Sequence, residues 1–277
     1  MHSHKKIDIP VDDTFAQKFA EMYIHQRSLP QFNYSQLNNS VLFNNLGFGT
    51  DALKDIITKN AAPIDKKREQ GIEPKILNDI YRSDLGELLM TYYFEEKLPE
   101  GERFIIPIKN ITFRERAELP GRGLDAIGYQ QISDTKVEIS LGEAKVSGEQ
   151  KSPPAVVDST KDSIYKAQLN HKNNIPTVIQ RLSDYCRRLN NEHAKILGFA
   201  IVCLEKGLND NYSITYGCTL IRDHTCVNEE TDFGKMKLNA SEFEPGKVHF
   251  SILSFKNKKI DETVDLFYKK VQELIVD

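Results

Sequence analysis

The stretch GLDAIGYQQISDTKVEISLGEAKVSG (123–148) decides the fold, because two strand patterns lie there on either side of a short turn. Apolar and β-branched residues recur at alternate positions over 123–130 and again over 136–146, which is typical of β-strands. The residues between them, 132–135, include Ser and Asp and predict a hairpin turn. We therefore expect two adjacent antiparallel strands.

Two charged residues fall on the apolar face of the second strand. Side chains alternate between the faces of a strand, so the apolar positions of the run VEISL (137–141) share a face with Glu143 and Lys145. Buried charges of this kind need a partner, a metal ion or a wet cleft. Two structural alternatives stay open: the strand has left the core by Leu141, or a bulge at Gly142 reverses the alternation.

A further carboxylate belongs to the first strand. Asp125 shares a face with Ile127 and lies 18 residues before Glu143, a separation at which a hairpin can place the two side by side. Two such carboxylates followed by a lysine would form an oxygen site for a hard cation, with an ammonium group beside it. The structural alternative is that Asp125 is an ordinary turn residue at the start of a strand.

A third carboxylate, Glu87, lies in a helical pattern. Apolar residues recur at three- and four-residue spacings over 76–93, which predicts one buried helical stripe, and Glu87 lies off that stripe. The structural alternative is a capping box, Asp84-x-x-Glu87, at the start of a helix.

The remaining patterns predict an α/β fold, in which a mixed central β-sheet is flanked by helices. We expect residues 1–74 to be an N-terminal extension and residues 75–277 the main domain. Within the extension, the Asn-rich segment 31–45 is either a surface loop or a partner-binding surface, and the charged segment 64–74 is a linker. The other predicted elements are helices at 15–24, 155–192 (interrupted near Pro176) and 262–276, and strands at 103–108, 196–204, 212–221 and 248–255.

Composition excludes several classes of protein. The 277 residues include 37 Lys and Arg against 40 Asp and Glu, so the chain as a whole is not a basic nucleic-acid coat. The hydrophobic fraction of 39% excludes wholesale disorder. The four cysteines form no CxxC pair, and no signal peptide or membrane-spanning run is present, so we expect a cytoplasmic protein with reduced thiols and no membrane contact. No GxxxxGK[ST] motif is present, so we infer no ATP hydrolysis by this chain.

Together, Glu87, Asp125 and Glu143-Ala144-Lys145 resemble the signature of the PD-(D/E)XK nuclease superfamily, although Leu124 replaces the proline of that motif. The segments RSDLGELL, GRGLDAIGY and ISLGEAKVSG also look like the nuclease subunit of the Hachiman antiphage defence system. That resemblance covers about residues 80–150. It implies a restriction-endonuclease-like core, bacterial immunity by DNA cutting, and a superfamily 2 helicase as the partner.

The resemblance also implies a role for each site residue. Asp125 and Glu143 would bind Mg²⁺ or Mn²⁺, with the main-chain carbonyl of Ala144 as a further ligand. Lys145 would orient or help to deprotonate the attacking water, and Glu87 would hold a further water or a second ion.

We expect DNA to contact the helices after this strand, because residues 151–195 contain eight Lys and Arg against four Asp and Glu. The candidate contacts on these helices are Lys161, Lys166 and Lys172. The resemblance implies a further candidate, Gln168 or the later Gln180, because related nucleases have a helix Gln or Lys that reaches the cleft. Solvated helix faces often carry similar charge, which is the structural alternative. Two other functions compete with the nuclease: a non-catalytic subunit of the same fold that binds and regulates a helicase, and an enzyme that acts on RNA.

Overall fold

The computed structural model describes residues 2–28, 50–62, 75–114, 123–188 and 192–276. Its centre is a six-stranded sheet with the order β1-β6-β5-β4-β3-β2. Strands β2, β3 and β4 are antiparallel neighbours, whereas β4, β5, β6 and β1 run parallel. The strands are β1 (Ser3–Ile9), β2 (Ile105–Lys109), β3 (Ala126–Ser133), β4 (Lys136–Ser147), β5 (Tyr212–Asp223) and β6 (Lys247–Phe255).

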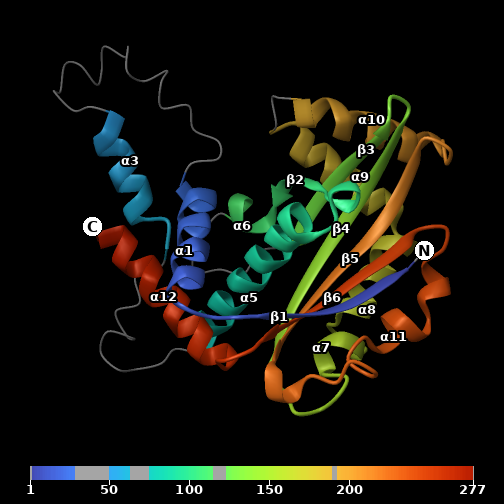
Figure 1. The fold of residues 1–277 in the computed structure, drawn as a ribbon. Coiled ribbons are helices and arrows are strands. Elements are labelled where there is room, and N and C mark those ends of the chain that lie inside the picture. Colours follow the sequence, from blue (N-terminus) through green and yellow to red (C-terminus); the bar gives the residue numbers. More distant parts are fainter. Residues whose placement is uncertain (1, 29–49, 63–74, 115–122, 189–191, 277) are drawn as a thin grey trace.

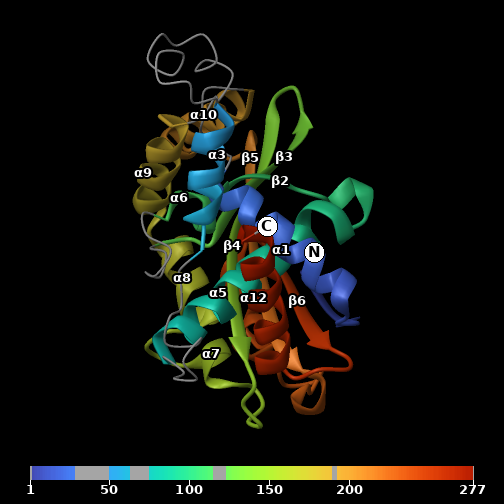
Figure 2. The ribbon, with the colours of Figure 1, turned by 90° about the vertical axis from the view of Figure 1, so that its left-hand side faces the viewer.

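Helices cover both faces of this sheet (Figures 1 and 2). On one face, α1 (Asp13–Ser28), α5 (Lys75–Tyr92) and α12 (Ile260–Val276) pack over a core that includes Phe255. On the other face, α8 (Ile164–Asn173), α9 (Ile175–Cys186) and α10 (Glu192–Lys206) enclose a second core that includes Leu141. The predicted mixed sheet flanked by helices is therefore confirmed.

The shorter elements join these layers. Helix α3 (Thr50–Lys59) contacts α1 and α12, and the π-helical turn Tyr93–Lys97 continues α5. Helices α6 (Asn110–Phe113), α7 (Ala155–Asp158) and α11 (Gly234–Leu238) lie in the connections, together with 3₁₀ turns at Glu100–Glu102, His224–Cys226 and Ala240–Phe243. No helix among the described residues is both long and apolar enough to cross a membrane.

The hairpin prediction is confirmed. Ser133 pairs with Lys136 across a two-residue loop, and the register shifts between Ser133 and Gln131. From Gln131 opposite Val137 the pairing then runs without interruption to Ala126 opposite Gly142. No bulge occurs at Gly142, and β4 stays paired with β5 as far as Ser147. Both structural alternatives for this strand are therefore wrong, and the alternation places Glu143 on the same face as Leu141.

Two predictions about other elements are wrong. The apolar run 196–204 belongs to helix α10 and not to a strand, because Leu197, Ala200 and Leu204 are buried at helical spacing while Val202 stays exposed. An apolar run of this length does not distinguish a buried strand from a buried helix. The Asp84-x-x-Glu87 sequence is not a capping box either, since α5 begins at Lys75.

The N-terminal residues are part of the main fold. Strand β1 pairs in parallel with β6, and α1 packs on α12, so this part of the expected N-terminal extension has no core of its own. The sequence 3–9 lacks strict alternation because both faces of β1 are partly buried. The segments 31–45 and 64–74, for which we predicted a loop or partner surface and a linker, lie outside the described residues.

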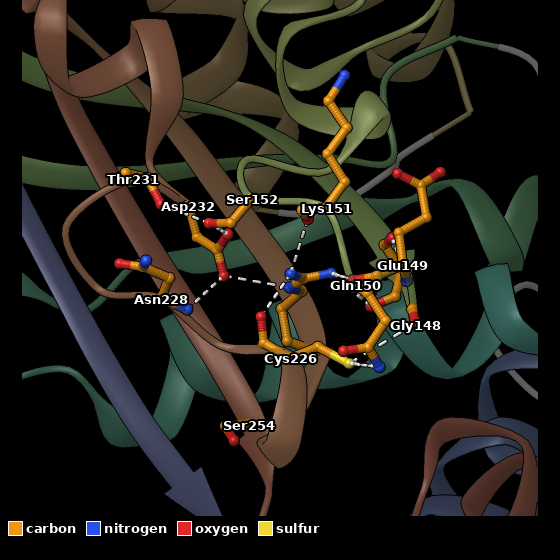
Figure 3. A network of polar contacts seen from close by, with 12 residues as sticks. Gly148, Glu149, Gln150, Lys151, Ser152, Cys226, Asn228, Thr231, Asp232 and Ser254 are labelled. Atoms are coloured by element: carbon orange, nitrogen blue, oxygen red, sulfur yellow. Dashed lines mark hydrogen bonds and ion pairs between the residues drawn. The ribbon is translucent and has the colours of Figure 1, made fainter.

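A buried arginine holds the loop that follows β4. The fully buried Arg222 of β5 donates hydrogen bonds to the main-chain oxygens of Glu149 (2.5 Å) and Lys151 (3.1 Å) in this loop and to that of Cys226 (2.6 Å). It also pairs with the buried Asp232 (3.1 Å). Figure 3 shows the loop residues and Asp232 gathered around these contacts. The guanidinium fork thereby fixes the chain as it leaves the central strand.

Replacing Arg222 with methionine should destabilise the fold by about 3–5 kcal/mol, because Asp232 and several loop carbonyls would stay buried without their partner. The free energy of unfolding in urea measures this effect. Arg187→Met is the matched control, since the Arg187 side chain is 76% exposed, and it should cost less than about 1 kcal/mol. Equal stability of the two variants would contradict the structural role of Arg222.

Candidate active site

The register of the β3–β4 hairpin brings Asp125 and Glu143 together. Ala126 pairs with Gly142, so Asp125, one residue earlier, lies opposite Glu143. The Oδ2 atom of Asp125 accepts a hydrogen bond from the main-chain N–H of Ala144 (2.8 Å). The N–H and C=O groups of one strand residue point to the same edge, so the Ala144 carbonyl also points towards Asp125 and not towards β5.

Lys145 lies on the same face of β4 as Glu143. Its Nζ atom is 3.3 Å from Oε1 of Glu143 and 3.0 Å from Oδ1 of Asp162. The sequence analysis missed Asp162, which lies in the loop before α8 and has an 80% exposed side chain. A single Asp in a polar loop carries no sequence signal that would have identified it.

Glu87 comes from α5 and is buried. Its Oε1 atom is 3.7 Å from Nη2 of Arg114, and the same nitrogen donates a short hydrogen bond to Asp84. The main chain of Arg114 is fixed in turn, because Arg27 of α1 donates hydrogen bonds to the carbonyls of Ile111 (3.1 Å) and Arg114 (2.9 Å). Sequence reasoning missed Arg114, whose position depends on these tertiary contacts.

These side chains line one polar cavity of about 500 Å³. It contains all four residues predicted to be catalytic: Glu87, Asp125, Glu143 and Lys145. The structure therefore brings the predicted set together, while the role of each residue stays a prediction. The remaining lining comes mainly from α8, α9 and the residue between them, and comprises Ser83, Asn110, Gly123, Asp162, Ala167, Asn170, His171, Asn174, Thr177 and Arg181.

Burial dominates the electrostatics of this cavity. Burial raises the pKa of Asp125 to about 6, although the Ala144 N–H and Lys145 oppose the shift. Burial, followed by the charge of Asp125, raises the pKa of both Glu87 and Glu143 well above the ordinary value. For Lys145, burial favours the neutral amine, but Glu143 and Asp162 outweigh it and raise the pKa. The cavity thus holds mutually repelling carboxylates beside one firmly protonated amine.

A divalent cation would relieve this repulsion. Asp125, Glu143 and the Ala144 carbonyl offer the oxygen ligands that Mg²⁺ and Mn²⁺ prefer, and one buried oxygen of Glu87, Oε2, has no hydrogen-bond partner among the described residues. No group of three His, Cys, Asp or Glu side chains in the described ranges is arranged to hold an ion by itself. The oxygen donors of Asp125, Glu143 and the Ala144 carbonyl suit a hard cation such as Mg²⁺, which usually keeps several water ligands.

The predicted nucleic-acid contacts differ in their exposure and in their own hydrogen bonds. Lys161 is exposed beside Asp162, and Lys166 is exposed but bonds to the carbonyl of Thr160 (2.5 Å). Lys172 bonds to the carbonyl of Glu242 and does not line the cavity. Gln168 is fully buried and donates to the carbonyls of Leu141 (2.9 Å) and Gly217 (3.0 Å), so its assignment as a nucleic-acid contact is wrong. Gln180 is exposed but is not part of the cavity lining.

The raised pKa of Asp125 predicts how the stability of the metal-free protein depends on pH. Between pH 3.8 and about 6 the folded state keeps a proton that the unfolded state releases, so stability falls as pH rises through this window. The loss is about 3 kcal/mol for Asp125 alone. Asp125→Asn should therefore be more stable than wild type at pH 7.5 without divalent ions, by denaturant unfolding.

The control for this experiment is Asp134→Asn, the same change in the exposed turn of the same hairpin. Asp134→Asn should leave the pH dependence of the free energy of unfolding unchanged. Added Mg²⁺ should raise the melting temperature of wild type and Asp134→Asn at pH 7.5 but not that of Asp125→Asn. A metal-free wild type that grows more stable from pH 4.5 to 7 relative to Asp125→Asn would contradict the prediction.

Comparison with known proteins identifies the family. Neither the curated proteins nor the solved structures include a significant match to the chain. The model of the HamA family, in contrast, matches residues 3–271. This match covers both helical layers and every strand of the sheet, and it agrees with the resemblance seen in the sequence. The chain therefore belongs to the HamA family, a component of the Hachiman antiphage defence system.

Proposed function

We propose that this HamA-family chain is a metal-dependent endonuclease that cuts DNA under the control of a partner helicase. The observation that carries the proposal is the pairing of Asp125 with Glu143 at the base of one hairpin, with Lys145 on the same strand face and the cavity open to solvent. The buried Glu143 beside the half-buried Asp125 and an adjacent amine is costly for folding and useful for phosphodiester hydrolysis.

Each residue has a role that follows from its surroundings. Asp125, oriented by the Ala144 N–H, and Glu143 would hold the ion together with the Ala144 carbonyl. When bound, Mg²⁺ or Mn²⁺ supplies a Lewis acid that activates water and neutralises charge on the scissile phosphate. Glu143 and Asp162 raise the pKa of Lys145 in the metal-free protein, so we assign the protonated Lys145 to stabilising negative charge on the phosphate and orienting the water.

Glu87 has a supporting role. Arg114 lies between Glu87 and Asp84 and offsets part of their charge, which leaves the second oxygen of Glu87 available to the cavity. That oxygen would orient a water ligand of the ion, because outer-shell carboxylates commonly fix the geometry of the groups that contact a metal.

The assignments of DNA as substrate and of a helicase as partner rest on the family. A Hachiman component acts against phage, and phage genomes offer DNA as the target. The printed sequence contains no nucleotide-binding GxxxxGK[ST] motif, so any ATP-driven step would come from another protein. An enzyme that cuts RNA would use the same residues. Adding RNA as a competitor in the DNA cleavage assay tests this alternative, because a preferred RNA substrate would slow DNA cleavage.

A second candidate function is a non-catalytic subunit that binds and regulates the helicase. A different cavity favours it: a mostly apolar groove of about 1060 Å³ between β1, α1 and the end of α5. Its lining includes Phe15, Phe19 and Tyr92, and the Nζ atom of Lys18 lies 3.7 Å from the centre of the Tyr92 ring. Isothermal titration with Mg²⁺ or Mn²⁺ in the presence of DNA separates the candidates, because only the nuclease requires ion binding.

The nuclease proposal predicts that Glu143→Gln abolishes cleavage. The change removes one ion ligand and the partner of Lys145, so we expect cleavage of plasmid DNA by the purified chain, with Mg²⁺ and its co-purifying partner, to fall at least about 100-fold. Agarose gels of supercoiled, nicked and linear DNA measure the rate.

Glu138→Gln is the matched control for this assay. Glu138 is a buried glutamate on the opposite face of β4, where it bonds Lys247 (2.9 Å) and Thr215, so its loss should leave the cleavage rate within about twofold of wild type. Equal cleavage by wild type and Glu143→Gln would reject the active site. An absence of ion binding to wild type would favour the regulatory subunit instead.

A further inference from the structure

The α8–α9 side of the cavity carries polar groups that the proposed reaction does not use. His171 lies near the end of α8, and Asn174 lies between the two helices. Thr177 and Arg181 follow at the third and seventh positions after Asn174, so all three lie on one face of α9. These four residues line the same cavity as Asp125 and Glu143.

Two of these side chains hold nitrogen atoms without a partner. The Nη1 atom of Arg181 and the Nε2 atom of His171 are enclosed, and neither has a hydrogen-bond partner within the described part of the chain. An enclosed polar atom that makes no hydrogen bond costs about 1–3 kcal/mol. Native structures keep such atoms mainly where a ligand, an ion or water completes the bond.

A glycine lets Arg181 approach the segment that leads into β3. A Cβ atom at Gly123 would lie 3.0 Å from both Cζ and Nη1 of Arg181, closer than such atoms normally pack. Gly123 also has φ = 106°, a conformation that L side chains rarely adopt. The guanidinium therefore lies against the backbone only two residues before Asp125.

The charges on this side of the cavity favour an anion. Burial, followed by the charge of Arg181, lowers the pKa of His171 to about 4, so at neutral pH His171 is an uncharged hydrogen-bonding group beside a cation. The first turn of α9 adds few free donors, because Pro176 has no N–H group and the Thr177 N–H donates to the Asn174 carbonyl (3.0 Å). The guanidinium of Arg181 is therefore the main attraction for an anion on this side.

We propose that Arg181, together with His171, binds a backbone phosphate of a polynucleotide strand, next to the phosphate that is cut. This subsite rests on the proposed nuclease function and gives it a substrate-positioning group. A guanidinium fork binds phosphate through two parallel hydrogen bonds, and phosphate contacts fix the register of a strand without reading its sequence. The subsite would hold the strand while the carboxylates and Lys145 act on the neighbouring linkage.

Binding of a fluorescein-labelled DNA oligonucleotide to the full chain tests this subsite without cleavage. Fluorescence anisotropy is measured with Ca²⁺ in place of Mg²⁺, for wild type and Arg181→Gln. We expect the Kd to rise about 10- to 100-fold in the variant, the range for one charge-assisted contact. The slope of log K against log salt should also become shallower by about 0.7–0.9.

Arg187→Gln is the matched control, because Arg187 follows α9 directly, is exposed, and loses the same charge. Its Kd should stay within about twofold of wild type. Arg181→Lys keeps the charge but not the fork and should bind with intermediate affinity. Circular dichroism and the melting temperature show whether each variant is folded. If Arg181→Gln does not fold, the affinity of Arg181→Lys provides the test.

The results separate the subsite from the nuclease. Wild-type affinity in Arg181→Gln, an equal loss in Arg187→Gln, or no binding of the oligonucleotide by wild type at low salt would each overturn the subsite. A selective loss in Arg181→Gln supports the subsite even if wild type cuts no DNA, which would reject the nuclease alone. If wild type and Arg181→Gln cleave DNA with the same KM, the subsite is rejected and the nuclease proposal stands.

Discussion

The site depends on one constraint: the antiparallel β3–β4 pairing ends at Ala126 and Gly142, so the next residues, Asp125 and Glu143, lie beside each other. Residues directly opposite on neighbouring strands have Cβ atoms about 4.5–5.5 Å apart, and like charges in that position destabilise a sheet. Strand β4 is central and covered by helices on both faces, so Glu143 cannot turn to bulk water. The repulsion must be met inside the protein by a proton, by Lys145 or by a bound cation.

The arrangement of the sheet leaves space for a bound cation beside the two carboxylates. Strand β3 begins at Ala126, whereas β4 continues to Ser147, so the last residues of β4 pair only with β5. Beyond Gly142, the edge of β4 that faced β3 is therefore available to other groups. The Asp125 carboxylate takes the Ala144 N–H, and the cavity opens where the rest of β3 would have been. Arg222 then fixes the loop that leaves this end of the strand.

Local patterns predicted the part of the site that lies on the hairpin. Alternation along 136–146 and the turn at 132–135 were sufficient to place Asp125, Glu143 and Lys145 together, because strand geometry is fixed by period and register. Arg114 and Arg181 escaped prediction, since their positions depend on Arg27 and Gly123 from distant segments. Gln168 was assigned to nucleic acid on resemblance alone, whereas in the fold it bonds two strand carbonyls from within the core.

The predicted domain boundary near residue 74 also rested on local sequence features, which do not report contacts between distant segments. The weak periodicity of the first 70 residues and the charged segment 64–74 suggested the boundary. In the structure, however, Arg27 of α1 bonds to the carbonyls of Ile111 and Arg114, and the Arg114 side chain contacts Glu87 in the cavity. Three contacts therefore connect α1 to the carboxylate cluster. The main chain of Arg114, whose side chain offsets the charge of Asp84 and Glu87, is therefore held in place by a residue of α1. The N-terminal helix is thus part of the structure that sets the charge of the site.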